Sequence, residues 1–132
     1  MVTSDMLYVG CYTGESPAGI HVFDVTDGAF TKVGEVIGIE NPSFLAAHPN
    51  GATVYAVSET SNGRGDGGSL FALAVDPDDG SLTPTQKVAS RGDAPCHLSV
   101  TADGAHLYVA NYGSGSVASF ALGPDGSIGP LA

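Results

Sequence analysis

Short apolar runs recur along the chain, alternate with polar residues, and are separated by turns rich in Gly, Pro and Asp. Alternation with a period of two is typical of β-strands that bury one face. No stretch carries apolar residues at helical spacing over three turns, so we expect no helix. The pairs Asn50-Gly51, Asp79-Gly80 and Asp125-Gly126 supply the positive φ angles that tight hairpins need. The pattern predicts an all-β protein built from short antiparallel strands.

The pattern also repeats along the chain. Residues 42–57 and 95–110 align without a gap at a shift of 53 residues, with Pro, Leu, Gly, Ala and Tyr at matching positions. Leu7-Tyr8-Val9 supplies a third, partial copy, and Asp-Gly followed by a strand recurs at 27–28, 79–80 and 125–126. A fixed period of this size indicates units that bury their apolar faces only by stacking on their neighbours.

Each complete copy contains four expected strands. Those of the second copy are expected at about residues 43–48, 53–58, 69–75 and 81–89. Four antiparallel strands in about 40–50 residues make one blade of a β-propeller. A β-sandwich would explain the strand spacing, but it would not explain why one signature returns once per four strands.

We therefore predict an all-β fold of β-propeller blades, each of four antiparallel strands. The first copy lacks its innermost strand and the third ends within its last strand, so the chain holds about two and a half blades. The expected blades are residues 6–38, 42–90 and 95–132, the last one incomplete. Such an array is expected to need the remaining blades, or self-association through exposed blade faces, to cover its apolar surfaces.

Charge and cysteine content narrow the possible partners. Four basic and fourteen acidic residues give a net charge of −10, which disfavours nucleic acid and anionic membranes as partners. No apolar run is long enough to span a membrane, and the N-terminus lacks the basic region of a signal peptide. Cys11 and Cys96 form neither a CxxC pair nor a disulfide framework. We expect a cytoplasmic protein.

The blade pattern places the loops at two ends of the sheets. The hairpins between first and second strands, and between third and fourth strands, share one end and are short and uniform. The other end carries the connections into the innermost strands, such as Asn41-Pro42 and Asp93-Ala94-Pro95, and the longer loops between second and third strands. Variable loops on a rigid scaffold commonly carry function, so we seek the site at this second end.

His97 is the candidate catalytic residue. It occupies the position of Phe44 in the preceding copy, at the start of an innermost strand near the central channel. An imidazole there could act as a general base. The alternative is a structural histidine that is half-buried and hydrogen-bonded to a neighbouring blade. His21, His48 and His106 are expected to be structural.

The candidate substrate-binding residues are polar side chains of the same end: Asn41, Glu59, Arg64, Asn111 and Tyr112. Glu59 and Asn111 are taken as equivalent by the repeat, and a carboxylate with an amide suits a hydroxyl-rich ligand. Capping of backbone groups at strand ends is the alternative role for them. Arg64 is the only cation assigned to these loops, in a Gly-rich stretch that is expected to be flexible. It could meet a phosphate or a carboxylate.

Metal and cofactor motifs are not found. Asp76-Pro77-Asp78-Asp79-Gly80 lacks the alternating ligands and the Glu of a calcium loop and is interpreted as a turn. The sequence has no zinc spacing, phosphate-binding loop or Gly-x-Ser-x-Gly motif. No cofactor is expected.

Five segments resemble the seven-bladed lactonase family, which includes propeller-type bacterial 6-phosphogluconolactonases and fungal carboxy-muconate lactonising enzymes. They are residues 7–14, 19–24, 40–46, 95–100 and 109–117. The resemblance implies hydrolysis of 6-phosphoglucono-1,5-lactone, a step of the pentose phosphate pathway. It also implies that this chain covers little more than a third of a member, with most catalytic residues in later blades. Only His97 is carried over as catalytic.

Two other functions remain open on the sequence. One is a non-catalytic propeller that serves as a binding scaffold, since propellers host many functions. The other is a muconate-type lactonising cycloisomerase of the same family. For the leading hypothesis the expected partner is a small-molecule sugar lactone, and the chain alone is expected to be inactive.

Overall fold

The computed structural model describes residues 5–132, and these residues form strands, turns and loops without any helix. The first sheet contains β1 (Met6–Gly10), β2 (Ala18–Asp24) and β3 (Thr31–Ile37). The second contains β4 (Leu45–Ala47), β5 (Thr53–Ser58), β6 (Ser69–Val75) and β7 (Leu82–Ala89). The third contains β8 (Pro95–Val100), β9 (His106–Asn111), β10 (Ser116–Leu122) and β11 (Ile128–Leu131). The all-β prediction is confirmed.

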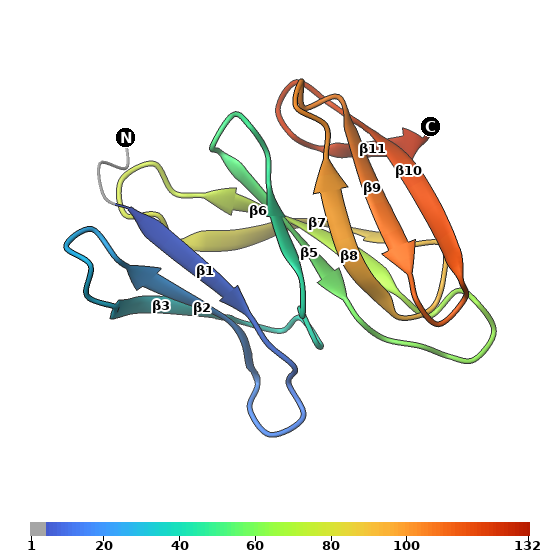
Figure 1. Ribbon diagram of the computed structural model, residues 1–132, viewed down its shortest axis with the longest axis horizontal. Coiled ribbons are helices and arrows are strands. Elements are labelled where there is room, and N and C mark those ends of the chain that lie inside the picture. The colour runs from blue at the N-terminus through green and yellow to red at the C-terminus, as the bar shows by residue number, and fades with distance from the viewer. Residues whose placement is uncertain (1–4) are drawn as a thin grey trace.

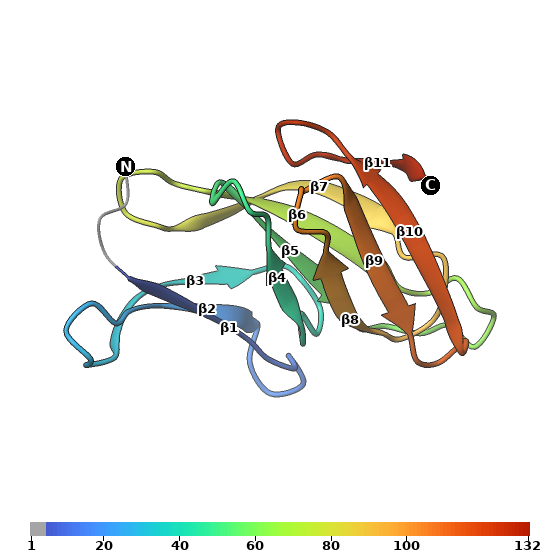
Figure 2. The ribbon, with the colours of Figure 1, turned by 45° about the horizontal axis from the view of Figure 1, so that its top comes forward.

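All three sheets are antiparallel, with strands paired in chain order. Figures 1 and 2 show the sheets one after another, from β1–β3 through β4–β7 to β8–β11. Three of the four strands expected in the second copy are found within one residue of their predicted bounds. The innermost, β4, is only three residues long, and just beyond its end the backbone N–H of His48 donates to Thr53 O, 2.9 Å away. No helix that could span a membrane occurs in residues 5–132.

The repeat predicted from the sequence has the same register in the second and third sheets. Tyr55 pairs with Ala46 on β4 and Ala72 on β6, while Tyr108 pairs with Ser99 on β8 and Ser119 on β10. The two tyrosines therefore occupy equivalent places on the second strand of their sheets. The shift of 53 residues holds in three dimensions.

Successive sheets pack face against face. We call the side of a sheet that is turned toward the next sheet along the chain its forward face, and the opposite side its backward face. The forward face of the second sheet buries Tyr55, Val57 and Leu70 against Leu107 and Phe120 of the third. A second cluster joins Ile20 and Val22 of the first sheet to Val54, Ala56 and Leu73 of the second. Burial of these apolar side chains holds the array together.

A tyrosine hydrogen bond repeats at both junctions. Tyr8 Oη donates to Gly80 O at 2.6 Å, and Tyr55 Oη donates to Gly126 O at 2.5 Å. Tyr8 on β1 and Tyr55 on β5 occupy matching positions of the repeat, and in each pair the glycine lies in the Asp-Gly turn of the next sheet. Burial raises the pKa of Tyr55 to about 12, so its hydroxyl remains a donor at neutral pH. Each sheet is thus bonded to the turn of its successor.

The loops lie at two ends, as the repeat predicts. The turn end carries the β4–β5, β6–β7, β8–β9 and β10–β11 turns, where His48 Nε2 lies 3.1 Å from Gly104 O. The loop end carries residues 11–17, 38–44, 59–68, 90–94 and 112–115. There Asn41 contacts Thr13, and Asp93 contacts the 61–67 loop. The candidate residues must be judged at the loop end.

Candidate site at the loop end of the sheets

A carboxylate with two hydroxyl partners forms the best-defined polar group at the loop end. Tyr12 Oη donates to Glu59 Oε2 at 2.9 Å, and Ser43 Oγ donates to the same oxygen. The hydrogen bond from Tyr12 to Glu59, together with the negative charge of Glu59, raises the pKa of Tyr12. These three side chains come from both the first and the second sheet. They can exchange hydrogen bonds with the hydroxyls of a bound ligand.

Asn41 fixes the connection that carries Ser43. Its Oδ1 accepts hydrogen bonds from Thr13 N at 2.9 Å and Thr13 Oγ1 at 3.2 Å, and its backbone O accepts one from Glu59 N at 3.0 Å. Asn41 has a φ of +49°, a left-handed conformation that Asn tolerates better than most residues. Asn41 therefore positions Glu59, and its own side chain is committed to the first sheet.

His97 is exposed on β8, and its ring packs on Phe44 with centroids 4.4 Å apart. Phe44 is the residue at the matching repeat position, so the contact joins the inner edges of two neighbouring sheets. The imidazole makes no hydrogen bond to any residue in 5–132, and the hydrogen-bonded structural alternative is therefore not observed. Both ring nitrogens are free to meet a ligand.

The repeat relation assumed between Glu59 and Asn111 is wrong. Glu59 N donates to Asn41 O at 3.0 Å and Tyr112 N donates to Ala94 O at 2.9 Å, and Asn41 and Ala94 share a positive φ. Glu59 is thus equivalent to Tyr112. At the shift of 47 residues that relates the first copy to the second, Tyr12 occupies the same position. The repeat position just after β1, β5 and β9 is therefore occupied by Tyr12, Glu59 and Tyr112, respectively.

Asn111 caps the backbone and is buried beneath the surface of the loop end. It is 1% exposed, and its Nδ2 donates to Ser90 O at 3.1 Å. Its repeat equivalent, Ser58, is also buried and donates to Glu40 O at 2.7 Å. The capping alternative therefore describes Asn111 in this structure. Tyr112, the next residue, is instead largely exposed at the tip of the β9–β10 hairpin.

Asp93 organises the Gly-rich loop that carries Arg64, a role that sequence reasoning missed. Its Oδ1 accepts hydrogen bonds from Asn62 N at 3.1 Å and Gly67 N at 2.8 Å, and its Oδ2 accepts one from Gly65 N at 2.9 Å. Burial alone would raise the pKa of Asp93, but these backbone donors outweigh it and lower the pKa to about 2. The loop expected to be flexible is thus hydrogen-bonded to this carboxylate at three backbone N–H groups.

Stability should therefore depend on Asp93 at low pH. Its pKa lies below that of the unfolded chain, so its contribution is complete above about pH 4 and disappears as the pH falls toward about 2. In Asp93→Asn an amide NH₂ would face one of the backbone N–H donors. We expect a lower thermal midpoint, faster proteolysis within residues 61–68, and a weaker pH dependence in that range.

The matched control is Asp66→Asn, an exposed carboxylate of the same loop. Its effects on the thermal midpoint and on proteolysis should be small. Equal effects of the two variants, measured by thermal melts between about pH 4 and pH 2, would contradict the role of Asp93.

A second cation lies at the loop end, which corrects the assignment of Arg64 as the only one. The turn of Ser90, Arg91 and Gly92 connects β7 to β8, and Gly68 N donates to Gly92 O at 2.9 Å. The connection before Asp93 thus packs beside the Gly-rich loop. Arg91 is exposed with a φ of +65°, and Arg64 is also exposed. The sequence pattern already predicted the strand that became β7, and this strand ends at the loop end just before Arg91. Arg91 could therefore have been identified from the sequence as a second cation of the loop end.

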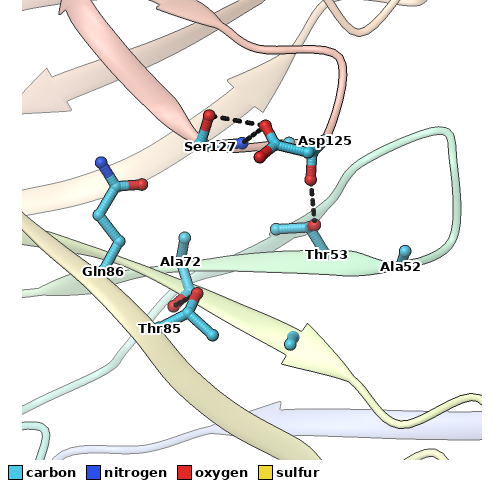
Figure 3. Close-up of a pocket in the computed structure, with 9 residues that line it drawn as sticks. Ala52, Thr53, Ala72, Thr85, Gln86, Asp125 and Ser127 are labelled. Carbon is cyan, nitrogen blue, oxygen red and sulfur yellow. Dashed lines mark hydrogen bonds between the residues drawn. The ribbon is translucent and has the colours of Figure 1, made fainter.

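A groove lies elsewhere, between the turn-end halves of the second and third sheets (Figure 3). It has a volume of about 430 Å³. Gln86 forms one wall and bridges the sheets, since its side chain exchanges two hydrogen bonds with the backbone of Ile128. Asp125 and Ser127 face Thr53 across the groove. None of the candidate residues lines it, and we interpret it as the junction of two sheets.

The loop end of residues 5–132 therefore offers an imidazole, several carboxylates, several hydroxyls and two guanidinium groups on an open surface. This set can bind a polyhydroxylated molecule and provide a general base. Within residues 5–132 there is no cluster of three or more His, Cys, Asp or Glu side chains that could hold a metal ion.

Comparison with known proteins agrees with the fold of residues 5–132. Residues 6–132 match the family described as lactonase, seven-bladed β-propeller. The chain is 32% identical over 123 residues to a 6-phosphogluconolactonase of Bacillus subtilis, covering 92% of this chain and 34% of that relative. The chain spans about a third of the length of the curated relatives it matches.

Solved structures have the same arrangement of sheets. A Bacteroides uniformis protein superposes with a TM-score of 0.84 at 31% identity, over 95% of this chain and 35% of that one. The periplasmic gluconolactonase of Pseudomonas aeruginosa superposes with a TM-score of 0.80 at 34% identity, over 97% of this chain and 37% of that one.

Proposed function

Since the chain belongs to the lactonase family of seven-bladed β-propellers, we propose that it forms part of an enzyme that hydrolyses a sugar lactone. The leading substrate is 6-phosphoglucono-1,5-lactone of the pentose phosphate pathway. The observation that carries the proposal is the exposed, unbonded imidazole of His97 beside Phe44, at the same end as the Glu59 carboxylate.

The residues have distinct proposed roles. His97 removes a proton from a water molecule, the water oxygen attacks the lactone carbonyl carbon, and the bond from that carbon to the ring oxygen breaks. The ring oxygen then takes up a proton and leaves as a hydroxyl group. Glu59, with Tyr12 and Ser43, binds hydroxyls of the sugar, and Tyr112 adds a further donor. Asn41 and Asn111 position the loops on which these residues lie.

A phosphate group on the substrate would be met by Arg64 and Arg91. Arginine binds phosphate through several N–H donors in a fixed geometry. Support for these two residues comes from their shared place at the loop end, on segments joined by the Gly68–Gly92 hydrogen bond.

An unphosphorylated aldonolactone is the second candidate substrate. The net charge of −10 and the scarcity of cations favour a neutral ligand over one that carries about two negative charges near pH 7. The Pseudomonas aeruginosa relative, a periplasmic gluconolactonase, supports the same alternative. Measuring turnover of glucono-1,5-lactone and of its 6-phosphate in parallel distinguishes the two.

The site is completed, in this proposal, by further sheets. We take the three sheets as blades spanning about residues 6–38, 42–90 and 95–132, and propose that further blades or copies of the chain line the rest of the channel. A cytoplasmic location is also proposed; the two free cysteines, Cys11 and Cys96, are compatible with a reducing compartment.

The test is a chimera in which this chain replaces the segment it matches in the Bacillus subtilis relative. We expect lactone hydrolysis by the chimera, and we expect His97→Ala to lower kcat by about 10²-fold or more, the usual contribution of a general base. His106→Ala, which removes an imidazole from the turn end, is the matched control and should leave kcat largely unchanged. An active chimera whose kcat survives His97→Ala would reject His97 as the base.

A further inference from the structure

The basic side chains that remain available to a ligand lie at the loop end. The chain has four Lys and Arg residues. Lys32 forms an ion pair at 2.8 Å, and the Lys87 ammonium group lies over an aromatic ring, 5.6 Å from its centroid. Within the described part of the chain, the guanidinium groups of Arg64 and Arg91 form no ion pair, ring contact or hydrogen bond. An anionic group on a ligand would therefore be met at the loop end of residues 5–132.

The Asp93 carboxylate fixes the backbone on both sides of Arg64. Its Oδ1 accepts from Asn62 N and Gly67 N, and its Oδ2 accepts from Gly65 N. Arg64 N itself donates to Asn62 Oδ1 at 2.8 Å. Backbone N–H groups that converge in this way form a nest, which is a geometry that holds an anion. The carboxylate of Asp93 is thus the anion around which the Gly-rich loop is folded, and it makes no ion pair with the guanidinium of Arg64.

Asp93 is itself held by the third sheet. Its backbone N donates to Ser114 Oγ at 2.7 Å, and Gly113 N donates to its backbone O at 3.0 Å. A Cβ on Gly65 would lie 3.7 Å from Ser114 Oγ, so the Gly-rich loop packs beside the β9–β10 hairpin (Figures 1 and 2). Asp93 therefore fixes the Gly-rich loop relative to the third sheet, on the connection that leads into β8 and His97.

We propose that Asp93 is a positioning residue, which holds the Gly-rich loop so that Arg64 binds the phosphate group of a phosphorylated sugar. A loop without this carboxylate would lose conformational entropy when Arg64 binds, whereas a loop that is already ordered does not. The inference rests on the proposed role of Arg64 in binding a substrate phosphate. Its test measures equilibrium binding and not lactone turnover, so the two proposals can fail separately.

Titration calorimetry of the chimera with 6-phosphogluconate and with gluconate tests this role. The two ligands differ only in the phosphate group, and both are already open acids, so no hydrolysis is needed. We expect the chimera to bind 6-phosphogluconate more tightly than gluconate. Asp93→Asn should weaken the binding of 6-phosphogluconate by about tenfold, as for the loss of a hydrogen bond to a charged group. The binding of gluconate should stay unchanged.

The direction of the change separates positioning from a simple effect of charge. Asp93→Asn removes a negative charge, which on charge alone should strengthen the binding of an anion. Positioning predicts weaker binding instead. Asp66→Asn is the matched control, because it removes the same charge from the exposed part of the same loop and should not weaken the binding of 6-phosphogluconate. Arg64→Ala should weaken it by about tenfold, and adding Asp93→Asn to Arg64→Ala should cause no further loss.

Ser114→Ala provides a milder test that keeps the carboxylate. It removes an exposed hydroxyl to which Asp93 N donates, and it should weaken the binding of 6-phosphogluconate by about twofold or more. If Asp93→Asn does not fold, unchanged binding by Ser114→Ala overturns the proposal.

Three other results would also overturn it. They are equal binding of the two ligands by the chimera, unchanged or tighter binding of 6-phosphogluconate by folded Asp93→Asn, and additive losses for Asp93→Asn and Arg64→Ala. A chimera that shows the expected binding but opens no lactone would instead reject the proposed hydrolysis alone.

Discussion

The 132-residue chain alone is expected to hydrolyse 6-phosphoglucono-1,5-lactone no faster than buffer does. Its three sheets leave the loop-end groups on an open surface, where water surrounds His97 and Glu59. Charges and dipoles that would stabilise an oxyanion in a closed channel lose most of their strength in water. Because loss of a single oxyanion donor already costs about 10²–10³ in kcat, loss of the enclosing channel should cost more.

Charge repulsion between the substrate and the chain should lower the activity further. The substrate carries about two negative charges near pH 7 and would approach a chain with a net charge of −10. The two arginines of the loop end, Arg64 and Arg91, are both exposed and therefore screened by salt. Binding should be weak before any chemistry begins.

A continuous assay of lactone opening, run beside the chimera at equal concentration, measures this expectation. Light scattering on the same samples shows whether the chain is monomeric. Robust turnover by a monomer, abolished by His97→Ala, would contradict the expectation and make this chain sufficient for catalysis. Turnover that appears only when the mass increases would show that neighbouring copies complete the channel.

The sheets could be predicted from the sequence because their determinants are local and repeated. Asp-Gly pairs fix the turns, alternation fixes the faces, and the Pro–Gly–Tyr signature fixes the period. The repeat also showed that Tyr55 and Tyr108 are equivalent. It did not show that one is buried and the other exposed, since burial depends on whether a following sheet is present.

The site was less predictable because it depends on contacts between segments far apart in the chain. Glu59 was identified as a strand-end carboxylate, but its partners Tyr12 and Ser43 come from other loops. Counting the repeat consistently would have matched Glu59 with Tyr12 and Tyr112. No local pattern, however, shows that the Asp93 carboxylate collects three backbone N–H groups from residues 62–67.

The largest effect on stability is expected from Leu70→Ala. Leu70 is fully buried on β6 in the cluster between the second and third sheets. Truncating a buried leucine removes its apolar contacts and leaves a cavity, at a cost of about 2–5 kcal/mol in the free energy of unfolding. Such a loss is a large fraction of the total stability of a small domain.

Val117→Ala is the matched control, because Val117 occupies the equivalent place on β10 of the third sheet and is exposed. At protein concentrations where the chain is monomeric, we expect this change to stay within about 0.5 kcal/mol, as for most surface substitutions. Urea unfolding followed by circular dichroism measures both variants. A loss for Val117→Ala as large as that for Leu70→Ala would mean that the forward face of the third sheet is already covered in the monomer. Since the residues are matched in sheet position, a large loss for Leu70→Ala alone would show that burial beneath a following sheet, and not the place in the sheet, determines the effect.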